Sequence, residues 1–415
     1  MNKYTTDQII QSLIFIIISN TVIDIANLWL GDYSMYLRIL FYAWVLYLFI
    51  MLTNCTIRYS KSIVFIIVFH LYTALLVLSS SNIFYSFKQY LAVLLAFICY
   101  IISLNIFSSF DQLKKFKSII IVLPILMIIN SFVSNYFNLG ITQYNAGFYS
   151  GSIETNKIYS ASLSIVLWMV LLPHFSSKKK KIFSTVVILI LSVIILLTMR
   201  RTGIIIVLLG ITIYFVMHNK KSYPLFLAVI SSIILFITYP IYKEILSSTI
   251  EARAHKVTME RGIEAEIRYK EILSVNNKIF SFSDPIYSLF GTELYNSRGT
   301  YNSHIHTFQF KRLLHSDYST ILHGSGLLGF LLYVMIFVSM YRDCSKLWRN
   351  EKKTIIVQEL KTVFLIFFIL AIVISIPGRM TAISFRTIIF SLLGATTGIL
   401  YNNKYGQCLK QKHLL

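Results

Sequence analysis

The chain has 415 residues, of which 56% are hydrophobic and only 13% are charged. Its mean hydropathy is +0.69. This composition excludes an ordinary water-soluble globular domain and predicts a polytopic membrane protein. A net charge of +21 also occurs in nucleic-acid-binding proteins, but here the charges lie in short clusters between apolar runs, which argues against nucleic acid as a partner.

About twelve apolar runs are long enough to cross a membrane as helices, which takes roughly 20 residues. They cover residues 9–30, 36–53, 62–79, 89–107, 118–137, 158–175, 182–199, 203–217, 224–242, 319–341, 361–378 and 386–401. The sequence therefore predicts an all-α polytopic membrane protein with about 12 transmembrane helices.

Basic residues predict the orientation of these spans. With the N-terminus inside, the inner segments carry about 21 of the 38 basic residues, among them the run Lys178 to Lys181. The short outer turns carry about seven, namely Arg38, Lys88, Lys157, Arg200, Arg201, Arg379 and Arg386. By the positive-inside rule both termini are cytoplasmic.

One outer loop divides the chain into three regions. Residues 1–242 hold nine spans, residues 243–318 form the loop, and residues 319–415 hold three spans and a cytoplasmic tail. A loop of roughly 75 residues is far longer than an ordinary connection and is usually functional. Its first part, Glu244 to Asn276, predicts one or two short surface helices. The stretch from Asn277 to Arg298 holds Asp284-Pro285 and Gly291 and predicts turns.

Arg200 and Arg201 occupy a tight hairpin at the outer ends of two spans. Their position opposes the positive-inside bias, and a guanidinium at membrane depth needs a carboxylate, carbonyl or phosphate partner. One interpretation is that they snorkel to lipid headgroups. The other is a phosphate clamp, because the planar fork of arginine donates two hydrogen bonds to one phosphate.

His315 lies where the long loop re-enters the membrane. An imidazole there can titrate near neutral pH and accept a proton from a sugar hydroxyl, or it can be a polar interfacial residue that bonds to the loop. Asp317 is close enough in sequence to orient the ring or, alternatively, to cap the entering helix. His304 and His306, in mid-loop, and His323, within the helical run, are competing histidines.

Other charged residues on the outer side are Arg268, Arg379 and Arg386. Arg268 follows a helical pattern in the long loop, where it could belong to a solvated face and pair with Glu264 or Glu271. Arg379 and Arg386 flank the last outer turn.

A few residues predict structural contacts. Asp24, a lone acid within the first span, could pair with Arg38 or simply lie at the membrane interface. The glycines Gly324, Gly326 and Gly329 permit close helix packing.

Several kinds of site are missing from the sequence. The four cysteines are scattered and predict neither a zinc site nor a disulfide framework. No Gly-rich phosphate loop appears, which argues against an ATP-driven pump. No Asp-x-Asp pair lies on the outer side to hold a divalent cation, so no metal and no cofactor are predicted.

Short motifs follow one another in a fixed order on the outer side. They are Tyr144–Asn156, Thr198–Gly203, Arg268, Leu289–Glu293, His315–Tyr318 and Gly326–Gly329. This order resembles the superfamily of bacterial O-antigen polymerases and O-antigen ligases, in which a Gly- and Phe-containing outer loop, an Arg-x-Gly turn and a periplasmic loop with Arg and His motifs recur. The resemblance covers residues 200–330 best.

The resemblance implies a fold like that of the GT-C type membrane glycosyltransferases. It implies that Arg200, Arg201 and Arg268 bind the pyrophosphate of an undecaprenyl-pyrophosphate-linked glycan donor, and that His315 activates the acceptor hydroxyl. The residues implied in support are Asp317, Tyr318, Arg379 and Arg386. The implied location is the bacterial inner membrane, with membrane lipids and a chain-length regulator and a flippase of the same pathway as partners.

The favoured activity is polymerisation of lipid-linked repeat units for O-antigen or capsule by an inverting, metal-independent transfer. The alternative is an O-antigen ligase that transfers finished polymer to the lipid A core. A flippase or transporter of lipid-linked glycans is the alternative of a different class, and its signal would be charges that line a path across the membrane. The basic cluster instead lies at one predicted face, which favours an enzyme.

Overall fold

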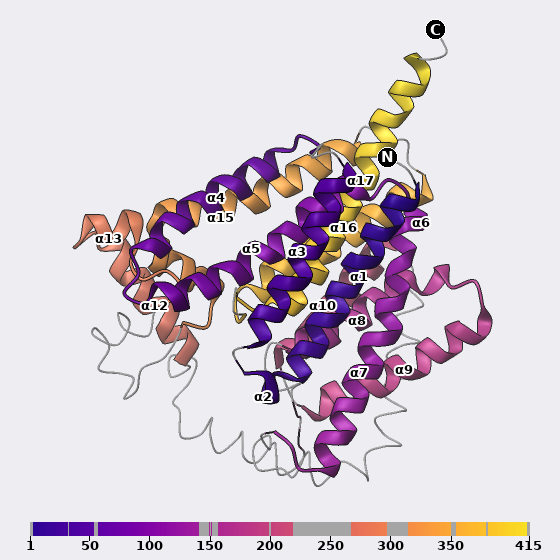
Figure 1. The fold of residues 1–415 in the computed structure, drawn as a ribbon, viewed down its shortest axis with the longest axis horizontal. Coiled ribbons are helices and arrows are strands. Elements are labelled where there is room, and N and C mark those ends of the chain that lie inside the picture. The colour runs from indigo at the N-terminus through magenta and orange to yellow at the C-terminus, as the bar shows by residue number, and fades with distance from the viewer. Residues whose placement is uncertain are drawn as a thin grey trace. The chain divides into compact units, whose positions relative to one another are not determined.

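A computed structural model describes residues 3–31, 33–53, 57–140, 149, 151, 157–198, 201–218, 267–296, 314–349, 354–378 and 381–412. Helices make up almost all of this part, and it contains no β-strand (Figure 1). The predicted all-α class is therefore confirmed for these residues. The chain forms two compact units. The first is Met1–Leu48, Phe110–Arg261 and Gln358–Leu370, and the second is Phe49–Ser109, Gly262–Val357 and Ala371–Leu415.

Within the described ranges, nine helices are long and apolar enough to cross a membrane. They are Thr6–Ile25, Tyr33–Met51, Lys61–Leu78, Ile83–Ile106, Phe110–Tyr136, Lys178–Leu197, Asp317–Arg349, Ile355–Ile374 and Ile383–Lys404. Two shorter apolar helices, Ile158–His174 and Thr202–His218, coincide with further predicted spans. The span predicted at 224–242 lies outside the described residues. These helices support a polytopic membrane protein by their length and composition.

The first unit contains residues Gln358–Leu370 of α16 (Ile355–Ile374), and its other helices come from the N-terminal half. They are α1 (Lys3–Ile25), α2 (Asn27–Leu30), most of α3 (Tyr33–Thr53), α6 (Phe110–Leu113), η1 (Lys114–Phe116), α7 (Lys117–Tyr136), α8 (Lys157–Leu171), η4 (Leu172–His174), α9 (Lys178–Leu197) and α10 (Arg201–His218). The predicted pairing of Asp24 with Arg38 is confirmed, since their carboxylate oxygen and guanidinium nitrogen lie 2.5 Å apart. This pair joins α1 to α3.

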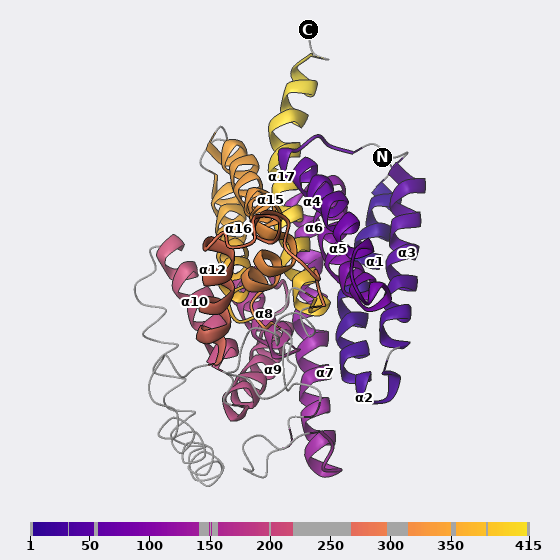
Figure 2. The same cartoon turned by 90° about the vertical axis from the view of Figure 1, so that its left-hand side faces the viewer.

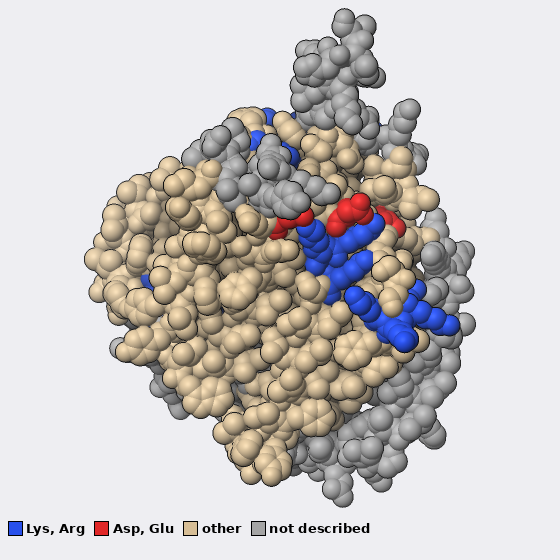
Figure 3. Space-filling view, turned by 45° about the vertical axis from the view of Figure 1, so that its right-hand side comes forward, with Lys and Arg blue, Asp and Glu red and all other residues tan. Residues whose placement is uncertain are grey.

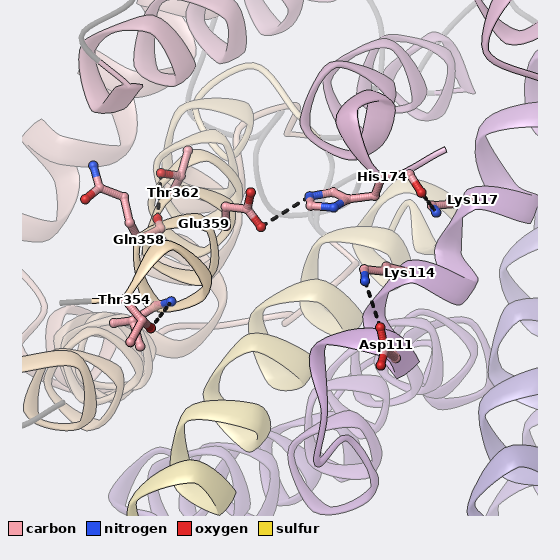
Figure 4. A network of polar contacts seen from close by, with 9 residues as sticks. Asp111, Lys114, Lys117, His174, Thr354, Gln358, Glu359 and Thr362 are labelled. Carbon is pink, nitrogen blue, oxygen red and sulfur yellow. Dashed lines mark hydrogen bonds and ion pairs between the residues drawn. The ribbon is translucent and has the colours of Figure 1, made fainter. Parts of the chain in front are cut away.

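Charged side chains of the first unit gather at helix ends. Lys115 pairs with Asp7 at 2.6 Å, which brings the start of α1 to the start of α7. Lys114 pairs with Asp111, and His174 pairs with Glu359 at 3.2 Å (Figure 4). Figure 3 shows a group of Lys and Arg side chains with some Asp and Glu beside a broad uncharged surface. This segregation is what an apolar solvent around the helices and water at their ends would produce.

The second unit holds α4 (Lys61–Leu78), α5 (Ile83–Ile106), α12 (Ile267–Phe280), α13 (Pro285–Phe290), α15 (Asp317–Arg349) and α17 (Ile383–Lys412), and the chain passes through it again at the end of α16 (Ile355–Ile374). α4 and α15 lie side by side (Figures 1 and 2). α17 approaches α5 so closely that a Cβ atom on Gly394 or Gly398 would lie 2.4 Å from the carbonyl oxygen of Tyr100 or Leu104. Backbones can come this near only where glycine leaves room.

The turns predicted for Asn277 to Arg298 are wrong in part. α12 continues to Phe280, and α13 covers Pro285–Phe290. The Asp284 side chain accepts a hydrogen bond from the Tyr287 amide at 3.1 Å, so it caps α13, and the proline that follows occupies the first helical turn. Asp-Pro and Gly are turn residues, but the same residues also begin and end a short helix.

α15 bends where α13 meets it. Gly326, within α15, has φ 60° and ψ −167°, so the helix consists of two pieces. A Cβ atom on Gly326 would lie 2.3 Å from the carbonyl group of Leu289, and a Cβ atom on Gly291 would lie 2.4 Å from the amide nitrogen of Ser325. The predicted packing role of the glycines is confirmed, and Gly329 likewise lies close to the Tyr72 ring of α4.

A loop that follows α13 is tied to the turn between α4 and α5. Both carboxylate oxygens of Glu293 are used, since they accept hydrogen bonds from the Ser80 hydroxyl at 2.9 Å and from the Ser81 amide at 3.0 Å. Burial by itself would raise the pKa of Glu293, but these bonds and those from the side chains of Ser81 and Asn296 together lower it. Glu293 itself has a positive φ of 53°, so the bonds hold a strained backbone.

We expect Gly326→Ala to destabilise the protein by more than Gly31→Ala. Both glycines have positive φ, which costs alanine about 1–2 kcal/mol, but nothing lies within 4 Å of a Cβ atom on Gly31. Alanine at 326 must also displace the Leu289 backbone. The thermal unfolding midpoints of the two purified variants in detergent test this. Equal midpoints would show that the contact between α13 and α15 is loose.

We also expect the stability that Glu293 contributes to depend on pH. Because its pKa is lower in the folded chain, this contribution is complete at neutral pH, begins to fall below the ordinary value of 4.5 and is lost as pH passes through the folded value. The unfolding midpoint of wild type should therefore exceed that of Glu293→Gln at pH 7, and the gap should narrow toward pH 3. A gap that stays constant over this range would contradict the role of the carboxylate.

Candidate functional site

His315 lies two residues before α15 and faces a carboxylate of α12. Its Nδ1 atom is 3.3 Å from Oε1 of Glu271, and its main-chain N–H donates to Oε2 of the same carboxylate at 3.3 Å. The His315 side chain is 22% exposed, whereas that of Glu271 is 1% exposed. The pair therefore joins an accessible imidazole to a buried carboxylate.

The sequence of α12 brings Glu271 to this position. Glu271, Val275 and Ile279 are spaced four residues apart, so they lie on one face of the helix. Val275 and Ile279 are buried in a small core with Tyr287, Leu314 and Leu322. Burial of this face against the start of α15 turns the carboxylate toward His315.

A buried carboxylate within ion-pair distance of an imidazole favours one orientation of the ring. This is the arrangement of a base that is held by a third group. It fits the predicted role of His315 in accepting a proton. The sequence predicts Glu271 only as a partner for Arg268 and does not predict its contact with His315. The signal was an acid at the same spacing as Val275 and Ile279.

Asp317 has a partner that the sequence did not suggest. Its carboxylate accepts a hydrogen bond from Nη2 of Arg386, and the exposed fractions of the two side chains are 0% and 3%. The Asp317 amide donates to the carbonyl oxygen of Ser375 at 3.0 Å. The contacts join the start of α15 to the start of α17 and the end of α16. Asp317 was a candidate to orient the imidazole of His315, but the carboxylate that faces this ring is that of Glu271.

Tyr318 and His323 also make contacts within the second unit. The Tyr318 hydroxyl donates to the carbonyl oxygen of Ile372 at 3.0 Å. His323 is buried, and its Nδ1 atom lies 2.5 Å from the hydroxyl of Tyr287. Burial raises the pKa of Tyr287, and the charge of Asp284 raises it further, so the phenol stays protonated and can donate to His323. His323 is therefore buried and bonded to Tyr287, whereas His315 is accessible.

The predicted arginines are only partly covered by the structure. Arg200 and Arg379 lie outside the described residues, as do His304 and His306. The backbone of Arg201 begins α10. That of Arg268 lies in the first turn of α12, one helical turn before Glu271. One predicted pyrophosphate-binding residue thus lies on the helix that carries Glu271, the carboxylate that faces His315.

A comparison with protein-family models finds no match, and a comparison with curated proteins finds none either. In the part of the chain that the structure describes, no group of three or more His, Cys, Asp and Glu side chains could hold a metal ion.

Breaking the buried ion pair should cost far more than breaking an exposed one. We expect Asp317→Asn or Arg386→Gln to lose about 3–5 kcal/mol, because each leaves a buried group without its partner. The matched control, Lys114→Gln, removes an exposed pair with Asp111 and should cost less than about 1 kcal/mol. Thermal unfolding in detergent compares them.

A double variant, Asp317→Leu with Arg386→Met, tests the origin of this cost. It removes both charges, so it should be more stable than either single variant. Single variants as stable as Lys114→Gln would contradict the structural role of the pair.

Proposed function

We propose that the chain is a membrane glycosyltransferase that polymerises undecaprenyl-pyrophosphate-linked oligosaccharide repeat units. The reaction takes place at the periplasmic face of the bacterial inner membrane, in a protein of about twelve spans with both termini cytoplasmic and a fold of the GT-C type. The observation that carries the proposal is the pair of His315 and Glu271, an oriented and accessible base at the membrane-entry end of an apolar helix.

In the proposed reaction His315 takes the proton of an acceptor sugar hydroxyl. The oxygen attacks the anomeric carbon of the donor from the side opposite the pyrophosphate. The new glycosidic bond forms as the bond from that carbon to the pyrophosphate oxygen breaks, so the configuration inverts and lipid pyrophosphate leaves with the electron pair. Glu271 keeps the ring oriented and supports the positive charge that it gains.

Arginines stabilise the leaving group in this scheme. Negative charge develops on the pyrophosphate as its bond breaks, and guanidinium groups suit it because they donate paired hydrogen bonds to phosphate oxygens. Arg268 is one candidate, since it belongs to the same helix as Glu271, and Arg200 and Arg201 are the others. The pyrophosphate supplies the driving force, so neither a nucleotide nor a metal ion is part of the scheme.

Two alternatives differ in what they move. An O-antigen ligase would use the same donor chemistry and transfer finished polymer to the lipid A core, so only the acceptor distinguishes it. A flippase would need polar groups along a path through the membrane. The accessible His315, paired with Glu271 just before α15 begins, favours group transfer over transport. The acceptor in our proposal is a second lipid-linked unit, and a chain-length regulator and a flippase act beside the enzyme.

The proposal can be tested by surface-polysaccharide gels of a deletion strain that carries wild type or a variant. We expect His315→Ala to abolish the polymer ladder, since loss of a general base slows transfer about 10²- to 10⁴-fold. Glu271→Gln should shorten the ladder, and Arg200→Ala, Arg201→Ala and Arg268→Ala should weaken it. Blotting must show equal protein levels.

A second His–Glu pair provides the matched control. His174 and Glu359 have the same chemistry in the first unit, so His174→Ala and Glu359→Gln should leave the ladder unchanged (Figure 4). A core with a single repeat unit in the deletion strain supports the polymerase, whereas a bare core with polymer left on the carrier lipid would identify a ligase. A normal ladder from well-expressed His315→Ala would overturn the catalytic role of His315.

A further inference from the structure

The hairpin formed by α12 and α13 exposes large apolar side chains although it belongs to no membrane-spanning segment. The exposed fractions are 45% for Leu273, 60% for Phe280, 46% for Phe282, 74% for Ile286, 43% for Leu289 and 45% for Phe290. Five of the six lie between Phe280 and Phe290. Soluble surfaces rarely expose so many large apolar groups together.

These side chains are not displaced members of the core. The inner face of the hairpin is already buried through Val275, Ile279 and Tyr287. The outer face therefore exposes a second set of apolar side chains, beside which Ser281, Ser283 and Asp284 are also exposed. From Phe280 to Phe290 the only charged residue is Asp284, and its carboxylate caps the start of α13. A surface with this composition fits a hydrocarbon environment better than water.

The hairpin is continuous with two membrane-spanning helices. Tyr72 of α4 donates to the carbonyl oxygen of Ser325 at 2.9 Å and lies within 3.4 Å of that of Phe290. The Leu289 backbone lies against Gly326 of α15. Figure 1 shows α13 at the end of α4 and α15 where α4 leads into α5. The apolar face of the hairpin thus meets the helices at their ends.

The exposed surface of those helices has the same character. Leu75 and Leu78, in the last turn of α4, are both 67% exposed, and Leu328 and Leu331, just after the bend of α15, are 42% and 59% exposed. In a membrane-spanning helix such leucines contact lipid chains. The hairpin, with its exposed apolar side chains, therefore contacts two helices whose own exposed side chains are also apolar.

We propose that the α12–α13 hairpin lies in the outer interface of the membrane, with Phe280, Phe282, Ile286, Leu289 and Phe290 in the lipid hydrocarbon. An amphipathic helix at this depth buries one face among acyl chains and keeps its polar groups at the headgroups. The occupant of the apolar face is bilayer lipid. This part of the long loop is then an anchor in the membrane rather than a segment in water.

The anchor lies on the same helix as Glu271. α12 carries the carboxylate at one end and leads into the anchored face at the other, so the depth of the hairpin sets the depth of the His315 dyad. If the proposed function holds, the base is held at the depth where the phosphates of a lipid-linked substrate lie. The anchor itself does not depend on that function.

Membrane depth can be measured by electron paramagnetic resonance on the full chain. The four native cysteines are replaced, and a nitroxide is attached at Ile286→Cys, at Phe282→Cys or, as the control, at Ser79→Cys. Ser79 lies in the turn that follows α4 and is exposed. The protein is reconstituted in bilayers of phosphatidylethanolamine and phosphatidylglycerol. Relaxation by oxygen reports exposure to lipid, and relaxation by a soluble nickel chelate reports exposure to water.

We expect the ratio of oxygen to nickel accessibility at positions 286 and 282 to be several-fold higher than at position 79. Nickel accessibility as high as at Ser79 would place the hairpin in water and overturn the proposal. Low accessibility to both reagents would mean that a second copy or another protein covers the face, which would also overturn it. Because no activity is measured, failure of the anchor and failure of the proposed enzyme are separate results.

Discussion

The buried ion pair between Asp317 and Arg386 is the contact on which the second unit depends. Both side chains are almost fully buried, where a charge without a partner would cost several kcal/mol. The pair forms where α15 and α17 begin, and the amide of Asp317 bonds to Ser375 just after α16 ends. Three helix ends are held together by one residue, through the carboxylate of Asp317 toward α17 and its main-chain amide toward the end of α16. Apolar packing is not directional, whereas the buried pair joins one residue of α15 to one residue of α17.

The geometry of the candidate site depends on the pair of Asp317 and Arg386. His315 lies two residues before Asp317, so the position of its backbone is set by the same pair. Glu271 reaches it because α12 packs Val275 and Ile279 against the beginning of α15. The bend at Gly326 then lets α13 come within backbone contact of α15. Glu271 is in this way placed beside His315 by packing contacts of α12 and α13 with α15 that are mostly apolar.

Local patterns predict the parts of this protein that depend on local physics. Apolar runs indicate the spans because the bilayer demands long uninterrupted helices, and Asp24 was paired with Arg38 because a lone acid in a span needs a counterion. The partners of His315 and Asp317 are 44 and 69 residues away, and no short pattern encodes them. α13 was interpreted as a turn because its capping residues are also turn residues. The arginine roles come from the motif resemblance.

The exposed α12–α13 hairpin and the pair of His315 and Glu271 both bear on one physical requirement of the proposed function. A lipid-linked substrate carries its reactive phosphates at the headgroups while its chain stays in the hydrocarbon, so a base that serves it must be held at that depth. A loop free in water would present His315 at variable heights, and each ångström of error weakens the proton transfer. In the proposed arrangement, α12 carries Glu271 and is followed by the exposed Phe280, Phe282 and Ile286, so it would link the height of the His315–Glu271 pair to the membrane surface. Exposed apolar groups, costly in a soluble loop, are thus consistent with a site that acts on lipid-bound molecules.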